Sequence, residues 1–399
     1  VLSRNVATYS TDSTMMERTN DIIWRPQPYI ATSIDGAPGT DISASYKNMT
    51  QLSVPATIGF SKTVPWTLNA KELRDALQEN RLGDSAKQKL ASDINVALMN
   101  VASAQGTLFV KRTAAASGFD DVAQAEAIFN EQGVPSYDRY LALSTRDYNG
   151  MASNLAGRQN VTDLPKEAYR RAYVGMIASF DTYKLDYANR VAAAGGAGLT
   201  IDTRDVAVNY YIPQATSASV GGKINVDNRY QTVTVSSTAS VAAGDAFTIA
   251  AVNAVHHITK QDTGQLKTFR VISVTNGTTM VISPPIISNQ VANDASAQYQ
   301  NCVVNTKSAT SAIVFLNTVA GYANPFWQRD ALEILPGRYA VPTDAGTAVM
   351  RASTDQGIEL VMQKFYDIDT MKTKYRLDTL FGVVCKQPEM AGLRMFSQT

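Results

Sequence analysis

Cysteine is scarce in this chain. Cys302 and Cys385 are the only two cysteines among 399 residues, and neither has a partner at a recognisable spacing. This scarcity excludes a disulfide framework and a cysteine-rich zinc site. A reducing compartment is the simpler interpretation, because disulfides persist mainly in oxidising surroundings.

Charge is scarce as well. Charged residues make up 18% of the sequence, against roughly 25% in an average soluble protein. The formal net charge is +1, so the chain lacks the clustered lysines and arginines that tight nucleic-acid binding requires. A surface rich in alanine and small polar residues instead suits burial against other subunits.

Long apolar runs are absent. No stretch approaches the roughly 18 apolar residues that a membrane-spanning helix needs. A positively charged start followed by an apolar block is the pattern of a signal peptide, and we do not find it here. We therefore expect no membrane partner.

Residues that could carry chemistry are few. The histidines are the neighbours His256 and His257, and adjacent strand residues point to opposite faces, so this pair is not expected to share a metal. The segment GGAGLT at 195–200 lacks the spacing of a dinucleotide-binding loop, and we interpret it as an interdomain hinge. The acidic pair Asp120–Asp121 fits a helix start, and the pair Asp367–Asp369 fits one face of a strand. Since no Gly-x-Ser-x-Gly motif is present either, we predict no enzymatic activity, no cofactor and no metal site.

The longest predicted helix covers residues 84–106. Ser85 with Gln88 predicts a capping-box start. Gly106 predicts the end, because glycine adopts the left-handed turn after a helix without a Cβ penalty. A strand, TLFVKR at 107–112, is predicted next. The apolar face of the helix has helical spacing and consists of Ala86, Leu90, Ile94, Ala97, Leu98 and Val101.

An alternating strand precedes this helix. Its apolar residues recur with a period of two, and they are Leu52, Val54, Ala56, Ile58 and Phe60. With Trp24 near its beginning and KTVPWTL as the returning strand, the segment 24–68 predicts an extended two-stranded arm. Two strands alone are marginally stable, so we expect the apolar face of the arm to lie on another subunit.

Shorter elements are predicted around the long helix. Asn69 with Glu72 starts a short helix, KELRDALQEN, ahead of the long one. The remaining predicted elements of this part are helices near 120–131, 145–156 and 165–178, the first with Gly133 as its stop, and a buried strand at 140–144.

The pattern changes near residue 200. From about 200 to 305 it consists of short strands separated by GD, DTG and NG turns, which predicts an inserted antiparallel barrel or sandwich. Within it, residues 211–226 are predicted to form a protruding loop. Residues 306–318 return to a helical pattern, and residues 357–396 contain long alternating strands. One of these, KFYDIDTMKTKYRLD, is predicted to line an intersubunit contact or a wet interior face.

The sequence resembles a known family at GGKINVDNRYQTVTV, residues 221–235. This stretch is similar to the inserted domain of the coat proteins of short-tailed, P22-type bacteriophages. Other landmarks follow in the same order, namely IIWRP (22–26), KELRDAL (71–77), LPKEAYR (164–170), NPFWQRDALEI (324–334) and LFGVVCKQPEMA (380–391). The resemblance covers nearly the whole chain.

The resemblance implies an α+β protein of the Hong Kong 97-type capsid fold with an inserted small antiparallel β-barrel. The implied divisions are an N-terminal arm (1–23), an extended arm or E-loop (24–68), a peripheral domain with the spine helix 84–106 (69–112), an axial domain (113–198), the inserted β-barrel (199–318), the continued axial domain (319–352) and C-terminal peripheral and axial strands (353–399).

The resemblance also implies a function. The chain would be a major capsid protein whose hexamers and pentamers close an icosahedral shell around the double-stranded DNA of a tailed phage, by procapsid assembly and expansion. The implied partners are other copies of the chain, a scaffolding protein, a portal protein and, weakly, the packaged DNA. The chain would reside in the virion capsid after assembly in the host cytoplasm. The alternative from the residues alone is a sugar- or polymer-binding module built on the barrel, which leaves the arms and the long helix without a role.

In such coat proteins a loop of the inserted domain contacts its counterpart across a two-fold axis. By position this loop is 213–224 here, but it is short and has no acid before Asp227, so hydrogen bonds and backbone contacts are expected rather than salt bridges. Together with the arm, it gives ten predicted intersubunit contact residues: Trp24, Leu52, Val54, Ile58, Phe60, Ser219, Gly221, Lys223, Asp227 and Arg229.

Overall fold

The structure is a computed structural model. It describes residues 2–9, 22–27, 31–46 except 32, 35, 37 and 40, then 50–69, 71–72, 76–156, 174–201, 209–214, 226–291, 294–306, 310–341 and 348–399. The chain divides into two compact units. Unit 1 consists of Val1–Ile23, Pro55–Val101 and Leu332–Cys385, and unit 2 consists of Trp24–Val54, Ala102–Ala331 and Lys386–Thr399.

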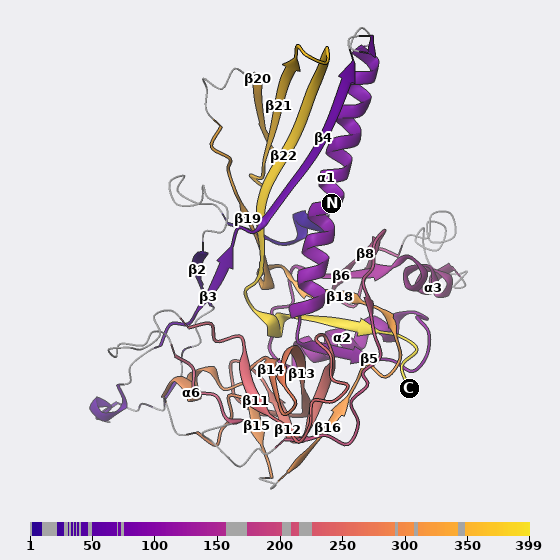
Figure 1. Ribbon diagram of the computed structural model, residues 1–399. Coiled ribbons are helices and arrows are strands. Elements are labelled where there is room, and N and C mark those ends of the chain that lie inside the picture. Colours follow the sequence, from indigo (N-terminus) through magenta and orange to yellow (C-terminus); the bar gives the residue numbers. More distant parts are fainter. Residues whose placement is uncertain are drawn as a thin grey trace. The chain divides into compact units, whose positions relative to one another are not determined.

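Unit 1 is a sheet with a long helix packed on it (Figure 1). The strand order is β1-β19-β22-β21-β20, and β4 pairs with the first part of β22. The strands are β1 (Ala7–Thr8), β4 (Phe60–Asn69), β19 (Leu332–Pro336), β20 (Ala348–Ser353), β21 (Glu359–Asp367) and β22 (Lys372–Cys385), with a short 3-10 helix η1 (Leu2–Asn5). The helix contributes Ala86 and Leu90 to a core with Leu377, because these residues lie on the apolar face that the sequence predicts.

The long helix α1, Ala76–Gln105, is longer than predicted. Its 30 residues span about 45 Å at the usual rise per residue. Ser85 lies in its interior, so the predicted capping-box start there is wrong. The sequence before Ser85, ALQENRL, consists mostly of strong helix formers, which carry the helix through the single weak position Gly83. For the same reason residues 76–80 belong to α1 and not to a separate short helix.

The reciprocal cap predicted at Asn69 and Glu72 is confirmed. The Asn69 side chain accepts a hydrogen bond from the Glu72 amide at 2.9 Å, and the Glu72 carboxylate accepts one from the Asn69 amide at 3.1 Å. These bonds satisfy amide donors that the first turn of a helix leaves free.

The helix ends before Gly106, as predicted, but the physical reason differs. Gly106 does not have a positive φ. A Cβ there would lie 3.0 Å from backbone atoms of Ala391 and Gly392. Glycine is therefore required because a strand backbone passes close to the helix end, and not because of a left-handed turn.

The predicted two-stranded arm is not observed. Strand β3 (Ser53–Thr57) pairs with β2 (Ile22–Pro26), whereas the predicted returning strand is β4, which pairs with β22. A Cβ on Gly382 of β22 would meet the Thr57 carbonyl oxygen at 2.5 Å and the Ile58 Cα at 3.1 Å. The glycine lets the backbone at 57–58 lie directly on β22, so the arm sequence joins the main sheet of its own unit.

Unit 2 contains a second mixed sheet with the strand order β5-β23-β18-β6-β8-β7. Its strands are β5 (Leu108–Lys111), β6 (Arg139–Ser144), β7 (Met176–Ile177), β8 (Phe180–Leu185), β18 (Asn324–Gln328) and β23 (Ala391–Met395), and its helices are α2 (Phe119–Glu131), α3 (Thr145–Ala156), η2 (Ser43–Ser45), η4 (Arg329–Ala331) and η5 (Pro388–Met390). A core of aromatic residues holds the sheet and α2 together. The ring centroid of Phe129 lies 5.4 Å from that of Phe180 and 5.2 Å from that of Phe326.

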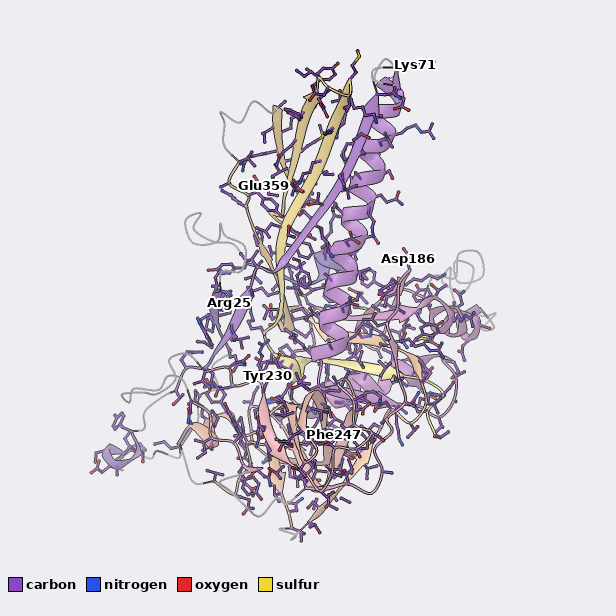
Figure 2. The ribbon with its side chains drawn as sticks, viewed as in Figure 1. Arg25, Lys71, Asp186, Tyr230, Phe247 and Glu359 are labelled. Atoms are coloured by element: carbon purple, nitrogen blue, oxygen red, sulfur yellow. The ribbon has the colours of Figure 1, made fainter. Side chains whose placement is uncertain are left out.

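The inserted segment forms a closed β-barrel, as the turn spacing predicts. The strand order is β10-β16-β12-β13-β14-β11, with β15 beside β12, and a bridge between Ile201 and Val235 joins the two edges. Its elements are β10 (Thr200–Ile201), β11 (Gln231–Thr234), β12 (Ala246–Val255), β13 (Asp262–Asn276), β14 (Thr279–Ser283), α6 (Asp294–Tyr299), β15 (Cys302–Val304) and β16 (Ser311–Phe315), next to the short pair β9 (Arg190–Val191) and β17 (Gly321–Tyr322). Phe247 lies in its filled interior (Figure 2).

Several local predictions are confirmed and others are wrong. Helices α2 and α3 and the buried strand β6 occupy their predicted positions. The predicted helix at 306–318 is wrong, because Ser311, Ile313 and Phe315 alternate inward on strand β16. Of the predicted helix at 165–178, residues 165–173 lie outside the described part and 176–177 form a strand.

The glycines of the predicted hinge at 195–200 pack closely instead. A Cβ on Gly195 would meet the Ser240 carbonyl oxygen at 2.9 Å, and a Cβ on Gly196 would meet the Phe315 ring at 2.6 Å. Small residues are therefore needed here so that the chain can lie against the barrel.

Candidate assembly surfaces

The apolar residues of the predicted arm are covered by the chain itself. Leu52 is 2% exposed, and Val54 and Ile58 are fully buried. The expectation that a neighbouring subunit buries these three side chains is wrong, because they are already buried within the chain. Phe60 is half-buried and stacks on Phe381 with ring centroids 5.3 Å apart, and Trp24 is half-buried on β2.

The predicted two-fold loop lies largely outside the described residues, including Ser219, Gly221 and Lys223. Asp227 and Arg229 follow it and pair with each other, with Nη2 of Arg229 2.8 Å from the carboxylate. Arg229 is 7% exposed and its guanidinium lies 4.9 Å from the centre of the Tyr230 ring. These two charges are therefore paired with each other within the chain, and their contact with a neighbour stays a prediction.

The segment KFYDIDTMKTKYRLD, predicted to line an intersubunit contact or a wet interior face, includes the end of the hairpin formed by β21 and β22. The apolar side chains there are exposed: Phe365 by 50%, Tyr366 by 46%, Ile368 by 78% and Met371 by 59%. We call these four residues the hairpin tip. A charged strand was predicted at this position, but the turn residues 368–371 interrupt the alternation and leave apolar side chains without a covered face.

Ionic contacts within the hairpin hold the tip in shape. Lys374 pairs with Asp367 across the strands at 2.9 Å, and the Asp369 amide donates to the Asp367 carboxylate at 3.2 Å. The hydrogen bond from Lys374 lowers the pKa of Asp367. Asp369 belongs to the turn, so the prediction that it shares a strand face with Asp367 is wrong.

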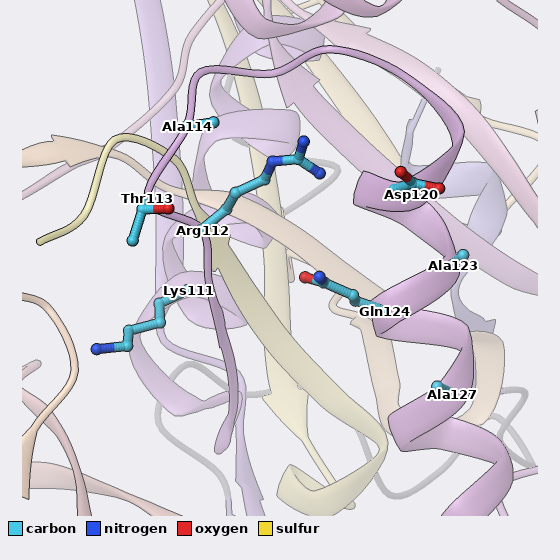
Figure 3. A pocket seen from close by; sticks show the side chains of 8 residues that line it. All are labelled: Lys111, Arg112, Thr113, Ala114, Asp120, Ala123, Gln124 and Ala127. Atoms are coloured by element: carbon cyan, nitrogen blue, oxygen red, sulfur yellow. The ribbon is translucent and has the colours of Figure 1, made fainter.

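An open hollow of about 710 Å³ lies between the end of β5 and helix α2 (Figure 3). Arg112 and Gln124 point into it from opposite sides. Its full lining is Lys111, Arg112, Thr113, Ala114, Asp120, Ala123, Gln124 and Ala127. This lining holds no histidine or cysteine, and Arg112 is already paired with Asp121.

Beneath this pocket, Asp121 organises a buried polar cluster. Its carboxylate accepts hydrogen bonds from the amides of Ser117 and Gly118 at 2.6 and 3.0 Å, which caps α2 as the acidic pair predicts. It also pairs with Arg112 and, at 3.3 Å, with the fully buried Arg394 of β23. Burial lowers the pKa of Arg394 to about 10, against the opposing effect of Asp121. The cluster fixes the start of α2 on the sheet.

Within the described residues, no cluster of three or more histidine, cysteine or acidic side chains suits a metal ion. In the same part of the chain, no helix combines the length and apolar character needed to cross a membrane.

Comparison with known proteins identifies the chain's relatives. The sequence model of the family described as P22 coat protein, gene protein 5, matches residues 1–397. The CUS-3 coat protein I-domain is 40% identical over 31% of this chain and 99% of that chain, with a TM-score of 0.22. A structure from Mycobacterium phage Che8 is 9% identical over 99% of this chain and 90% of that chain, with a TM-score of 0.47. The capsid structure of cyanophage P-SCSP1u is 10% identical over 99% of this chain and 86% of that chain, with a TM-score of 0.46.

The family match decides the assignment, because it includes both units and the inserted barrel. The long helix, the two sheets and the closed barrel are the parts that a Hong Kong 97-type capsid fold with an inserted domain requires. The chain therefore belongs to the P22 coat protein family: it is a major capsid protein of a tailed bacteriophage, with this α+β fold, and it self-associates into the icosahedral shell of the virion.

Proposed function

We propose that the chain builds its shell as a procapsid that a scaffolding protein guides in the host cytoplasm. The shell then expands as double-stranded DNA enters, with a portal protein as a further partner. Expansion is a repacking between two discrete arrangements of the same subunits. The near-neutral net charge of +1 supports a weak contact with the packaged DNA rather than a tight one.

The proposed role is structural rather than catalytic. The pocket beside Lys111 has no histidine or cysteine in its lining. The barrel interior is filled by side chains such as Phe247 and Phe269, whose ring centroids lie 5.7 Å apart. A filled barrel also argues against a sugar- or polymer-binding module that uses the barrel interior.

The hairpin tip is the observation that carries the assembly proposal. Folded monomers rarely expose several large apolar side chains together, and such patches mark surfaces that another protein covers. Because the chain self-associates, we assign this surface to a contact with a neighbouring copy. Trp24 and Phe60, which stay half-buried, and the loop residues Ser219, Gly221 and Lys223 remain proposed contacts as well.

The test is assembly of the purified chain, alone and with its scaffolding protein, followed by sedimentation and electron microscopy. The wild-type chain is expected to give closed shells of uniform diameter, with the scaffolding protein raising their yield. The double variant Ile368→Ser and Met371→Ser is expected to give far fewer shells, because the neighbour loses its apolar contact.

Ile258→Ser is the matched control, since Ile258 is 67% exposed on a turn of the barrel outside the hairpin tip. It is expected to assemble like the wild type. Wild-type shell yields from the double variant would remove the hairpin tip from the proposal. A wild-type chain that stays monomeric with and without scaffolding protein would overturn the assembly route itself.

A further inference from the structure

A buried group of charged residues lies where the inserted barrel meets the C-terminal segment of unit 2. Lys267 of β13 is 2% exposed and forms an ion pair with Glu389 of η5. Two more basic residues of the turn between β12 and β13 belong to the group, His257 and Lys260. We call these four residues the latch cluster.

The latch cluster holds more basic groups than acidic ones. Glu389 is its only acid and faces Lys267, Lys260 and His257. Burial alone would raise the pKa of Glu389, but Lys267, His257 and Lys260 together outweigh that effect, so the pKa is lowered and the carboxylate stays ionised. Lys260 donates to the Gln300 carbonyl oxygen at 3.0 Å, and burial lowers its pKa to about 8.

His257 is held in place as a neutral group. Its side chain is 8% exposed, and its backbone amide donates to the Gln132 carbonyl oxygen at 3.0 Å. Its Nε2 atom is buried without a hydrogen-bond partner among the described residues. Burial lowers the pKa of His257 to about 4, while Glu389 raises it and Lys267, Lys260 and His256 lower it further.

A small cavity of about 50 Å³ borders His257. Glu389, Gln387 and Arg229 also line it, and Arg229 is neutralised by Asp227. Tyr299 also lines this cavity. Cys302 interacts with Lys267 and Glu389, and burial raises its pKa to about 12, so it stays a neutral thiol. Among the described residues that line the cavity or act on His257, Glu389 is therefore the one carboxylate, and it is already paired with Lys267.

We propose that the latch cluster is an acid-sensitive latch between the inserted barrel and the C-terminal segment, closed while His257 is neutral and opened when His257 takes up a proton. A protonated imidazole would place a third cation beside Lys267 and Lys260 with only Glu389 to compensate. Separation of η5 from the barrel turn exposes the cluster to water and relieves that cost.

The direction of the pH effect follows from the two states. The pKa of His257 is near 4 when the latch is closed and near 6.5 when the imidazole is in water. The stabilisation is fully present above pH 6.5 and is lost as the pH falls toward 4, since the open state binds the proton first. At pH 4.5 the opening equilibrium is expected to be roughly 60-fold larger than at neutral pH.

The first measurement is the titration of each histidine in the full-length wild-type chain, by hydrogen–deuterium exchange at the imidazole C2 position. The sequence holds only His256 and His257, so one histidine is the internal reference for the other. We expect His257 to titrate near pH 4, well below the 6.5 of an imidazole in water. A His257 midpoint near 6.5 would overturn the proposal.

Variants then test whether charge sets the latch. Glu389→Gln removes the only acid and is expected to lower the His257 midpoint further, whereas Lys260→Gln removes a cation and is expected to raise it. Midpoints that do not move, or that move in the opposite directions, contradict the latch. These shifts are read from folded protein and do not depend on assembly.

Opening itself is measured by backbone hydrogen exchange between pH 7 and 4.5, corrected for the intrinsic pH dependence of exchange. In the wild type, the peptide that contains Pro388–Met390 is expected to lose protection on acidification, while the peptide from β12 keeps it. His257→Gln is expected to abolish this acid response and His256→Gln to retain it. An equal acid response in both variants would mean that another group opens the contact.

Discussion

The hairpin tip and the latch cluster reverse the usual distribution of side chains in opposite ways. The tip exposes Ile368 and Met371 by 78% and 59%, whereas the latch cluster keeps Lys267 only 2% exposed. Covering exposed apolar side chains lowers the free energy, and many different apolar surfaces can do this. A buried charge is stabilised only by a partner in the right position and orientation, because that interaction must offset the cost of removing the charge from water. The first region is therefore suited to contacts between copies, and the second to a single alignment within one copy.

The end of α1 also contacts a buried charge. Arg270 of β13 is 1% exposed, and it donates to the carbonyl oxygens of Ser103 and Gly106 at 3.0 and 3.3 Å. These are carbonyls that a helix end leaves without a partner, and a cation there also suits the helix dipole. The barrel thus holds the helix end by directional hydrogen bonds rather than by apolar contact alone.

The largest effect is expected from breaking a buried ion pair. Asp121→Asn leaves Arg394, fully buried, without its counter-charge. We expect a loss of about 3–5 kcal/mol in the free energy of unfolding, measured by urea denaturation. Asp120→Asn, at the exposed neighbouring position, is the control and is expected to stay within about 0.5 kcal/mol of the wild type. Equal losses in both variants would show that the cluster around Asp121 does not depend on its charge.

A smaller but clear loss is expected where the backbone of the arm segment lies on β22. Gly382→Ala places a Cβ 2.5 Å from the Thr57 carbonyl oxygen, so the strands must move apart. Overpacking of this kind costs about 1–3 kcal/mol, read from thermal unfolding. Gly277→Ala is the control, because no atom lies within 4 Å of the added Cβ. It shows the effect of a glycine-to-alanine change without a steric clash. A stable Gly382→Ala variant would argue that residues 57–58 do not lie on this strand.

The stacked aromatic pair on the main sheet of unit 1 should contribute less to the free energy of unfolding. Trp66 and Tyr375 lie with ring centroids 5.3 Å apart and almost parallel planes. Beyond the area that they bury, such pairs add about 0.5–1.5 kcal/mol. A double-mutant cycle with Trp66→Leu and Tyr375→Leu measures that coupling. Strictly additive losses would mean that the rings pack without a specific interaction.

The smallest effect on the isolated chain is expected at the hairpin tip. Ile368→Ser should change the unfolding free energy by less than about 0.5 kcal/mol, since the side chain is already in water. Combined with a reduced shell yield, this result would separate assembly from folding. A large loss of stability would instead place Ile368 in the core of its own unit.

Much of the local structure follows from the sequence. The apolar spacing of α1 places Ala86 and Leu90 on its packed face, and the Asn69 and Glu72 cap forms as predicted. The turn spacing between 200 and 305 predicts the barrel. These features depend on residues that lie close together in the chain, and their periodicity is visible without a structure.

What the sequence did not determine depends on residues far apart. The apolar face of residues 52–60 was correctly recognised, but only the tertiary structure decided that the chain buries Leu52, Val54 and Ile58 itself and that the backbone at 57–58 lies on Gly382 of β22, about 320 residues later. The same holds for Lys267 and Glu389, which are separated by 122 positions. The sequence by itself determined the elements, their apolar faces and the family resemblance, because these follow from local spacing and motifs. Only the folded chain decided which apolar faces it covers itself and which charges it buries in pairs, because burial is a property of distant segments brought together.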